Sequence, residues 1–247
     1  MNLLLLPGLL CDAAVWAPLL PHVEQAAECR IPTYHNATSL GAMADRVLAN
    51  APATFALAGH SMGGRVALEI VRRAPERVLR LALLDTGFRA RPEGPIGEDE
   101  KARRLALLAL ARAKGMRVMA REWVRPMVHP DRLGDATLID AILDMFERRT
   151  AIDFAGQIEA LLARPDATGV LASIEGPTLV LCGREDGWST PAQHEEIAAR
   201  IPGAQLVVIG HCGHMAPMER PREVANAMLA WLRTPSHGET VRPPLSA

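Results

Sequence analysis

The pattern in this sequence best suited to chemistry is a serine between glycines, Gly-His-Ser-Met-Gly at residues 59–63. The apolar segment 53–58 before it predicts a buried strand, and residues 65–73 after it have the periodicity of a helix. A serine at a tight strand-to-helix turn, in a G-x-S-x-G pattern, is typical of a nucleophile. Glycine leaves room where such a turn packs closely. The helix N-terminus behind Ser61 favours developing negative charge.

A carboxylate and a histidine follow two later apolar segments. Asp186 comes shortly after residues 178–182, and His214 shortly after residues 205–209. A serine attacks efficiently only when a base takes its proton, and the base needs a carboxylate to fix its tautomer. The carboxyl ends of parallel strands meet at one edge of a sheet, where ligands bind. We therefore predict that Ser61 is the nucleophile, Asp186 the acid and His214 the base.

Neighbouring residues offer alternatives for both partners of the serine. Glu185 is adjacent to Asp186, and Asp85 also ends a predicted strand. His211 lies near His214 in the same loop, where bonding to the backbone is the simpler role. The sequence favours Asp186 and His214 and leaves the others open.

The cysteines and the loop histidines are residue types that can bind a metal or, for cysteine, form a disulfide. His-Cys-Gly-His at 211–214 offers three donors, but donors packed so tightly rarely give tetrahedral zinc geometry, so no metal site is predicted. The four cysteines lack framework spacing, which favours reduced thiols in a cytoplasmic protein. A bridge between Cys11 and Cys212 is a minor alternative. The other two are Cys29 and Cys182.

Strands and helices alternate at both ends of the chain, which predicts an α/β fold with a mostly parallel sheet covered by helices on both faces. Expected strands cover residues 3–6, 29–32, 53–58, 78–84, 178–182 and 205–209, of which 29–32 has the weakest pattern. Expected helices cover residues 13–20, 40–49, 65–73, 191–200 and 221–232.

The middle of the chain lacks strand patterns. Helices are expected at 98–114, 116–124, 135–149 and 151–163, and the third has one apolar face, formed by Leu138, Ile139, Ile142, Leu143 and Phe146. Residues 87–97 read as a linker rich in glycine and proline. We predict a hydrolase-like core at 1–85 and 177–234, a helical lid at 86–176 and a flexible tail at 235–247.

Composition excludes several classes of protein. The formal net charge of −1 gives no global reason to expect nucleic acid or a membrane surface. No apolar run is long enough to span a bilayer, and residues 3–6 lack the basic flank of a signal peptide. Residues 101–125 contain many basic side chains and one acidic residue, Glu122. A solvated lid surface explains this stretch most simply. Docking of an acidic carrier protein, or of a carboxylate-bearing substrate, is the sharper alternative.

Three motifs together resemble the α/β-hydrolase superfamily: GHSMGG, GREDGWSTP and HCGHMAPMERP. The chain is similar from residue 3 to about residue 232 to small lidded carboxylesterases of the pimeloyl-carrier-protein methyl ester esterase type. Members commonly begin with two further strands, so the resemblance implies a sheet of about six strands here. Many also have His-Gly in the loop after the first strand, where this chain has Pro7-Gly8. The resemblance implies an oxyanion hole formed by the backbone N–H groups of Leu9 and Met62.

These observations predict a serine hydrolase that cleaves a carboxylic ester of small or medium acyl chain, with no cofactor. The predicted partner is a small ester, and the chain is expected to be a monomer or homodimer. Residues expected to line the substrate pocket are Trp16, His60, Phe88, Trp123, Trp188 and Met215.

Other functions remain compatible with the same residues. Amidases, thioesterases, lactonases, perhydrolases and carbon–carbon bond hydrolases use the same triad. A serine in place of a carboxylate nucleophile disfavours epoxide hydrolases and dehalogenases. A small-ligand receptor of the same fold would bind with negligible turnover.

Overall fold

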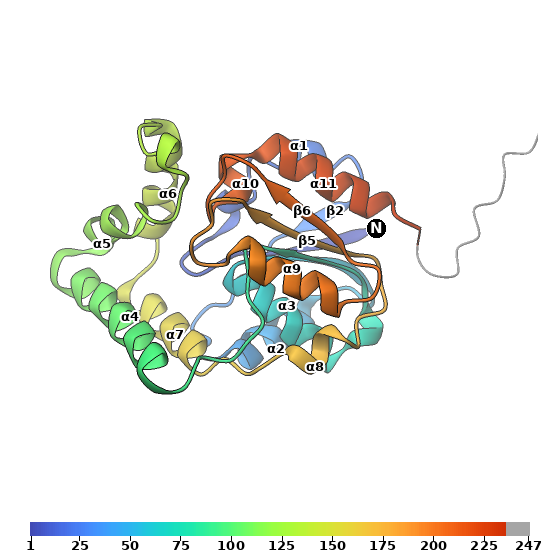
Figure 1. Cartoon of the computed structure of the whole chain (residues 1–247), viewed down its shortest axis with the longest axis horizontal. Helices are drawn as coiled ribbons and strands as arrows, with labels where there is room; N and C mark the ends of the chain where they lie inside the picture. Colours follow the sequence, from blue (N-terminus) through green and yellow to red (C-terminus); the bar gives the residue numbers. More distant parts are fainter. Residues whose placement is uncertain (236–247) are drawn as a thin grey trace, which may run out of the picture.

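The computed structural model describes residues 1–235 of the chain, so nearly all of the predicted tail at 235–247 lies outside the described residues. Its centre is a sheet of six parallel strands in the order β2-β1-β3-β4-β5-β6 (Figure 1). This confirms the predicted fold class and strand number. The strands are β1 (Asn2–Leu6), β2 (Glu28–Arg30), β3 (Phe55–His60), β4 (Val78–Leu84), β5 (Thr178–Gly183) and β6 (Gln205–Ile209).

The burial of the strands follows from their positions in the sheet. Every residue of β3 and β5 is buried, as expected for central strands covered by helices on both faces. The edge strand β6 begins with two exposed residues and is buried only at Ile209. The carboxyl ends of the central strands therefore form a rigid edge on which loops can hold side chains.

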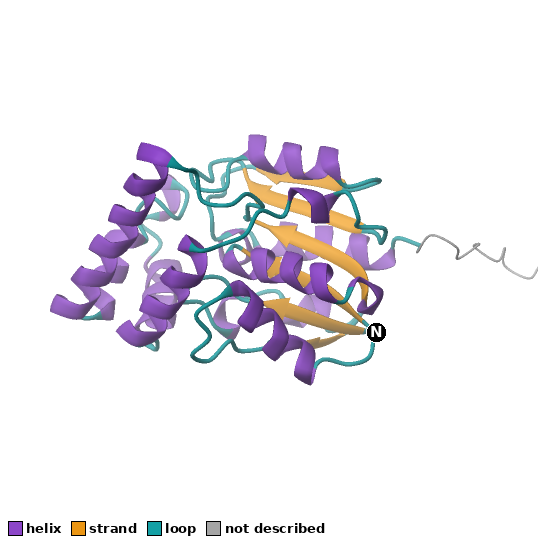
Figure 2. Cartoon of the chain, turned by 90° about the horizontal axis from the view of Figure 1, so that it is seen from below, coloured by secondary structure: helices purple, strands orange, loops and turns teal. Residues whose placement is uncertain are grey.

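Helices cover both faces of the sheet (Figures 1 and 2). Helices α2, α3, α8 and α9 pack as one layer, and α1 and α11 lie on the opposite face. Their bounds are α1 (Leu20–Val23), α2 (Leu40–Asn50), α3 (Met62–Arg73), α8 (Thr168–Leu171), α9 (Pro191–Arg200) and α11 (Pro221–Arg233), with α10 (Ala216–Glu219) before the last. Short 3-10 turns occur at Ala13–Val15, Pro75–Arg77 and Pro130–Arg132.

The expected helix at 13–20 is not formed, which corrects the prediction. The chain forms only a 3-10 turn at Ala13–Val15, and α1 begins at Leu20. Pro18 has no N–H to donate, so it interrupts a continuous helical ladder. Asp12 caps the turn by accepting a hydrogen bond from the N–H of Ala14. Val15, Trp16 and Leu19 of this segment are buried even though the long helix is absent.

The helical insertion lies between β4 and β5, at one end of the sheet (Figure 1). It comprises α4 (Gly94–Lys114), α5 (Met116–Trp123), α6 (Ala136–Glu147) and α7 (Ala151–Leu162). The expected linker at 87–97 is shorter than predicted, because α4 already begins at Gly94. Asp135 and Thr150 cap the last two helices with their side chains, as a sequence with acid or threonine at those positions favours. The expected apolar face of α6 is buried except for partly exposed Ile139.

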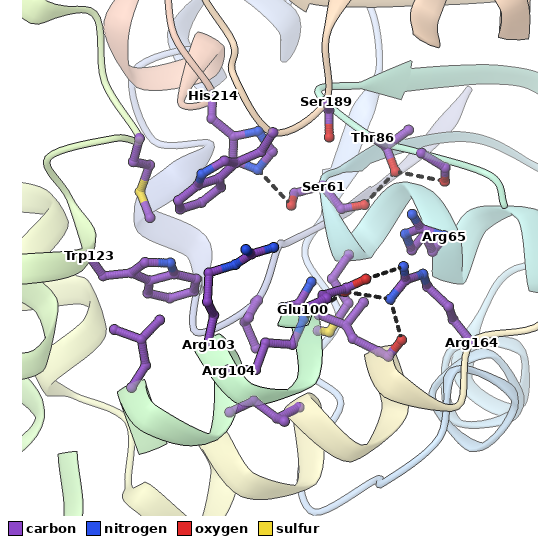
Figure 3. A pocket seen from close by; sticks show the side chains of 18 of the residues that line it. Ser61, Arg65, Thr86, Glu100, Arg103, Arg104, Trp123, Arg164, Ser189 and His214 are labelled. Carbon is purple, nitrogen blue, oxygen red and sulfur yellow. Dashed lines mark hydrogen bonds and ion pairs between the residues drawn. The ribbon is translucent and has the colours of Figure 1, made fainter. Parts of the chain in front are cut away.

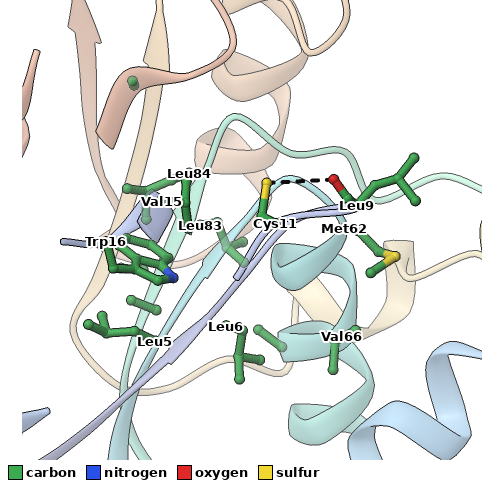
Figure 4. Close-up of a cluster of buried hydrophobic side chains, with 14 of the residues drawn as sticks. Leu5, Leu6, Leu9, Cys11, Val15, Trp16, Met62, Val66, Leu83 and Leu84 are labelled. Carbon is green, nitrogen blue, oxygen red and sulfur yellow. Dashed lines mark hydrogen bonds between the residues drawn. The ribbon is translucent and has the colours of Figure 1, made fainter. Parts of the chain in front are cut away.

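The core is continuous from the sheet into the first loop (Figure 4). Trp16 is fully buried there, beside the leucines of β1 and β4. All four cysteines are unpaired, so the alternative bridge between Cys11 and Cys212 is absent. Among residues 1–235, no helix combines the length and apolar character needed to cross a bilayer.

Candidate active site

The serine turn is held in a strained conformation by close packing. Ser61 has φ 54° and ψ −117°, a combination that costs a non-glycine residue energy and persists only where the surroundings enforce it. A Cβ at residue 63 would lie 2.2 Å from the carbonyl oxygen of Leu6, and one at residue 59 would lie 2.4 Å from the carbonyl oxygen of Gly63. The flanking glycines are therefore a steric requirement, as the sequence pattern predicted.

Ser61, His214 and Asp186 form one hydrogen-bonded chain (Figure 3). The His214 Nε2 lies 2.8 Å from the Ser61 Oγ, and the His214 Nδ1 lies 2.7 Å from the Asp186 Oδ2. With the Nδ1 proton directed at the carboxylate, the Nε2 lone pair faces the serine hydroxyl. This tautomer lets histidine accept the serine proton, and the carboxylate would stabilise the resulting imidazolium.

The carboxylate of Asp186 is held by its own loop. Its Oδ1 accepts hydrogen bonds from the backbone N–H groups of Trp188, at 2.8 Å, and Ser189, at 2.9 Å. Burial alone would raise the pKa of Asp186, but the charge and hydrogen bond of His214 and these two N–H groups lower it below its usual value. The carboxylate is therefore ionised and fixed in orientation at neutral pH.

The two competing carboxylates have backbone partners instead of His214. Asp85 accepts from the N–H of Gly183 at 3.0 Å and of Ala216 at 3.3 Å, while Glu185 accepts from the N–H of Cys212 at 2.9 Å. Burial and then the charge of Asp186 raise the pKa of Asp85 well above its usual value. Both side chains support the loops that carry the triad.

His211 is separated from the triad. Its backbone has φ 52°, and its carbonyl accepts a hydrogen bond from the Nε of Arg220 at 2.8 Å. Its ring lies beside His129, with centroids 5.5 Å apart, and donor atoms of His129, Asp131 and His211 lie within 4.8 Å of one another at the surface. The structure thus groups His211 with two residues of the insertion, not with Cys212 and His214.

Glu219 is a buried residue of the site that sequence reasoning missed. Its carboxylate accepts hydrogen bonds from the N–H groups of Gly213 and Met215, each at 3.1 Å, and of His129 at 2.8 Å. These bonds fix the loop on both sides of His214 and tie it to the insertion. The only signal in the sequence is an acidic residue five positions after the histidine, in a helix too short to show periodicity.

His60 lies beneath the serine turn and is buried. Its Nε2 is 2.8 Å from the carbonyl oxygen of His214, so that nitrogen carries the proton and donates. Burial and then the charge of His214 lower the pKa of His60 to about 3, which keeps the ring neutral. His60 also borders the cavity, so it both packs beneath the serine turn and forms part of the cavity wall.

The two residues expected to supply oxyanion donors both border the cavity beside the serine turn. Leu9 lies in the loop after β1, and Met62 is the first residue of α3. The loop is pressed against the serine turn, since a Cβ on Gly8 would lie 3.2 Å from the Ser61 Cβ. Neither N–H is hydrogen-bonded to another of the described residues. The adjacent N–H of Leu10 is held at 2.8 Å by the side-chain oxygen of Gln157 from the insertion.

A cavity of about 1150 Å³ opens over Ser61, between the sheet edge and the insertion. Five of the six residues expected to line a pocket border it: His60, Phe88, Trp123, Trp188 and Met215. Trp16 does not, which is a correction. Its ring is fully buried among core leucines and packs edge-on against His60 from the core side, with centroids 6.4 Å apart (Figure 4).

The cavity has an aromatic side and a basic side. Trp123 stacks on Trp188 with centroids 5.6 Å apart, and Trp188 lies 5.0 Å from the ring of His214. Figure 3 places Trp123 on one side of Ser61, with Arg65 and Arg164 on the other. Sequence reasoning missed this basic side, because Arg65 and Arg164 are distant in sequence and no periodicity links them.

The expected basic face at 101–125 is partly neutralised. Arg117 of α5 forms ion pairs with Asp144 at 2.5 Å, with Glu147 at 2.8 Å and with Asp140 at 3.4 Å, all on α6. Arg104 points toward the cavity wall and pairs with Glu100 at 2.9 Å. The stretch therefore does not present all its charges on one open surface.

Comparison with known proteins agrees with this geometry. Residues 3–227 match the alpha/beta hydrolase family. A pimeloyl-(acyl-carrier protein) methyl ester esterase of Aromatoleum aromaticum is 29% identical over 243 residues, which cover 91% of this chain and 95% of that protein.

Two solved structures share the fold. A thermophilic esterase from Thermogutta terrifontis, in a malate-bound structure, has a TM-score of 0.82 and 28% identity, covering 94% of this chain and 89% of that one. An enol-lactonase from Burkholderia xenovorans has a TM-score of 0.80 and 22% identity, covering 94% and 90%, and shows the fold alone. The chain therefore belongs to the alpha/beta hydrolase family and is a hydrolytic enzyme with a Ser–His–Asp network.

Proposed function

We propose that this protein is a serine hydrolase that cleaves a carboxylic ester of a small or medium acyl chain. The observation that carries the proposal is the continuous hydrogen-bonded chain from Ser61 through His214 to Asp186 at the floor of the cavity. Esterases among the similar proteins support the choice of an ester.

The proposed reaction begins with attack of the Ser61 Oγ on the ester carbonyl carbon while the His214 Nε2 takes the serine proton. The N–H groups of Leu9 and Met62 donate to the oxyanion that develops. His214 then gives its proton to the leaving alcohol, which breaks the carbon–oxygen bond and leaves an acyl-serine. Water, deprotonated by His214, hydrolyses the acyl-serine, and Asp186 orients the imidazole throughout.

The insertion, which we assign to residues 86–176, supplies the roof of the proposed site. Trp123 comes from this insertion, and Gln157 reaches from it to hold the loop that carries Leu9. The same triad also serves amides, thioesters, lactones, peracids and carbon–carbon bonds, so these substrates are comparison arms of the test. Docking of an acidic carrier protein at 101–125 stays a prediction.

The decisive experiment is steady-state hydrolysis of p-nitrophenyl esters from acetate to laurate. Wild type should show a maximum at one chain length, and Ser61→Ala should lower kcat by more than about 10⁴-fold. Ser173→Ala is the matched control, because this exposed serine lies away from the cavity and bonds only the Val170 carbonyl. Activity that survived Ser61→Ala would overturn the mechanism. Tight ligand binding without turnover would indicate the receptor alternative.

A further inference from the structure

The basic side of the cavity contains more positive than negative charge. Three arginines border it near one carboxylate: Arg65 of α3, Arg104 of α4, Arg164 after α7, and Glu100 of α4. They come from three separate parts of the chain and converge next to the serine turn (Figure 3).

Glu100 is fully engaged by two of these arginines. Arg164 contacts both carboxylate oxygens, at 2.7 and 2.8 Å, and the Nε of Arg104 contacts one of them at 2.9 Å. Burial alone would raise the pKa of Glu100, but the Arg164 hydrogen bond and the Arg104 charge lower it to about 2. Glu100 is therefore ionised, and its single negative charge is shared among three nearby arginines, of which only Arg104 and Arg164 contact it.

Arg65 has no carboxylate partner within ion-pair distance among the described residues. Its single hydrogen bond runs from Nη1 to the carbonyl oxygen of Arg89, at 2.9 Å. Burial, followed by the charges of Arg164 and Arg104, lowers the pKa of Arg65 to about 9, which still leaves it protonated at neutral pH. Gly87 provides the space for its guanidinium, because a Cβ there would lie 2.6 Å from Nη2.

Among the described residues, the other charged side chains of the cavity wall, which are Arg89, Arg103, Glu122 and Asp166, form no ion pair with Arg65. Arg89 pairs with Glu196, and Arg103 pairs with Asp99. The Asp166 carboxylate accepts a hydrogen bond from the N–H of Thr168. The basic side therefore has a surplus of two positive charges, from three guanidinium groups and one carboxylate.

Unused donors accompany this surplus. Arg164 donates to Glu100 and to the carbonyls of Leu161 and Arg89, whereas Arg104 uses only its Nε and Arg65 only its Nη1. A partly buried guanidinium without an anion is unfavourable, and a planar fork of N–H groups matches a carboxylate. An anionic group entering the cavity would remove the mutual repulsion and satisfy these donors.

We infer that Arg65 and Arg104 form a subsite for a carboxylate carried by the ester substrate, so that the preferred substrate is a half-ester or an acylated hydroxy acid. This inference rests on the proposed function for its catalytic readout. The ester carbonyl lies at Ser61, the carboxylate lies at the basic side, and the aromatic side receives the uncharged part.

The test compares esters that differ only in the distant carboxylate. Monomethyl succinate through monomethyl suberate is measured against methyl esters of monocarboxylic acids with the same number of carbons, for example monomethyl adipate against methyl hexanoate. A second arm, 4-acetoxybutanoate against butyl acetate, places the carboxylate on the alcohol side. We expect one half-ester, or the acetoxy acid, to exceed its neutral partner in kcat/KM by roughly tenfold to a hundredfold.

Variants assign that preference to the subsite. Arg65→Met should lower the ratio of charged to neutral kcat/KM at least tenfold, Arg65→Lys should restore part of it, and Arg104→Met should lower it less. Arg112→Met is the matched control, because Arg112 is an exposed residue of the same helix as Arg104 and does not border the cavity. It should leave the ratio unchanged. Since Arg65 is repelled by its neighbours, Arg65→Met should fold with an unchanged or higher Tm.

Failure of the subsite can be separated from failure of the proposed function. If neutral esters are hydrolysed as fast as charged ones and Arg65→Met does not change the ratio of their kcat/KM values, the subsite proposal is wrong. The proposed esterase activity would be unaffected by that result. If no ester is hydrolysed, ligand binding measured as a shift in Tm tests whether the subsite exists. Monomethyl adipate should raise the Tm of Ser61→Ala more than methyl hexanoate does at equal concentration, and Ser61→Ala/Arg65→Met should lose the difference. Equal shifts in both proteins would overturn the subsite.

Discussion

The parallel sheet and the helical insertion are stabilised by different interactions. Every residue of β3 and β5 is buried, and backbone approaches at Gly59 and Gly63 leave no room for a side chain. The long helix α4 of the insertion buries only Gly97, Leu108 and Ala111, and exposes Ile96 and Leu105. The elements of the insertion are also joined by ion pairs such as Arg164–Glu100, although α5, α6 and α7 bury apolar faces of their own.

This difference matches the part each region has in the site. Ser61, Asp186 and His214 are all placed by loops after strands, where displacements of a few tenths of an ångström are resisted by close packing. Arg104 comes from α4, which buries few side chains, so its position can adapt to a substrate, whereas Trp123 of α5 is buried. The core holds the triad, and both regions line the cavity, the insertion with Trp123 and Arg104 and the core with Arg65.

After loss of the nucleophile itself, the largest effect on activity should come from replacing one carboxylate oxygen of Asp186. Asp186→Asn should lower kcat about 10³- to 10⁴-fold, because the amide no longer stabilises the His214 tautomer and imidazolium. Glu185→Gln, which keeps an oxygen for the Cys212 N–H, should stay within about threefold of wild type. Kinetics on the best p-nitrophenyl ester measure both, and a greater loss in Glu185→Gln would reassign the acid.

Two glycine substitutions, one in the core and one in the insertion, should have different effects on the free energy of unfolding. Gly63→Ala places a Cβ 2.2 Å from a backbone oxygen, so we expect a loss of about 4 kcal/mol or more in the free energy of unfolding. Gly134→Ala, in the turn before α6 of the insertion, meets nothing within 4 Å and has no left-handed φ, so it should gain up to about 1 kcal/mol from the lower entropy of the unfolded chain. Urea unfolding measures both. Similar stability in the two variants would contradict the contrast drawn between the regions.

Truncating the aromatic side of the cavity should affect the substrate range and cost stability. Trp123 contacts the rings of Phe146, Phe154 and Trp188, with centroids 5.3, 5.7 and 5.6 Å away. Trp123→Ala should cost about 2–3 kcal/mol and shift the optimum of the p-nitrophenyl series toward longer acyl chains. An unchanged chain-length profile would show that the aromatic side does not face the acyl group.

An ion pair in the insertion should give stability that depends on pH. The pKa of Glu100 is lower in the folded protein than its ordinary value of 4.5, so its contribution is present above that pH and is lost as pH falls toward about 2. Glu100→Gln should therefore be about 1–2 kcal/mol less stable than wild type at pH 7, and the gap should narrow toward pH 3. A gap constant across this range would show that the charge does not stabilise the fold.

The smallest effect is expected on the outer surface of the insertion. Arg117 pairs with three partly exposed carboxylates of α6, and such pairs are screened by solvent. Arg117→Ala should lower the Tm only slightly and leave kcat/KM unchanged. The decrease in Tm should be smaller still in about 0.5–1 M salt, as measured by thermal unfolding. A decrease in Tm as large as that of Trp123→Ala would mean that α5 and α6 depend on this cluster.

Local patterns in the sequence were sufficient for much of the fold. Apolar runs predicted the five strands other than β2, because strands covered by helices must be apolar, and β2, with the sequence Glu-Cys-Arg, had only a weak pattern. The Ser61 turn was recognisable because only glycine tolerates its close approach at residues 59 and 63. The four-residue helices α8 and α10 were missed because so short a segment has no periodicity.

The tertiary structure decided what depends on contacts between distant segments. It selected Asp186 over Asp85 and Glu185, since only Asp186 lies 2.7 Å from His214, and it buried Trp16, which had been expected in the pocket. It also assembled Arg65, Arg104 and Arg164 around Glu100, although they lie on separate segments. Sequence patterns report how each segment buries its own apolar face. The partners of a polar side chain are determined only when the segments pack, because its hydrogen bonds and charge pairs require atoms that the neighbouring sequence does not supply.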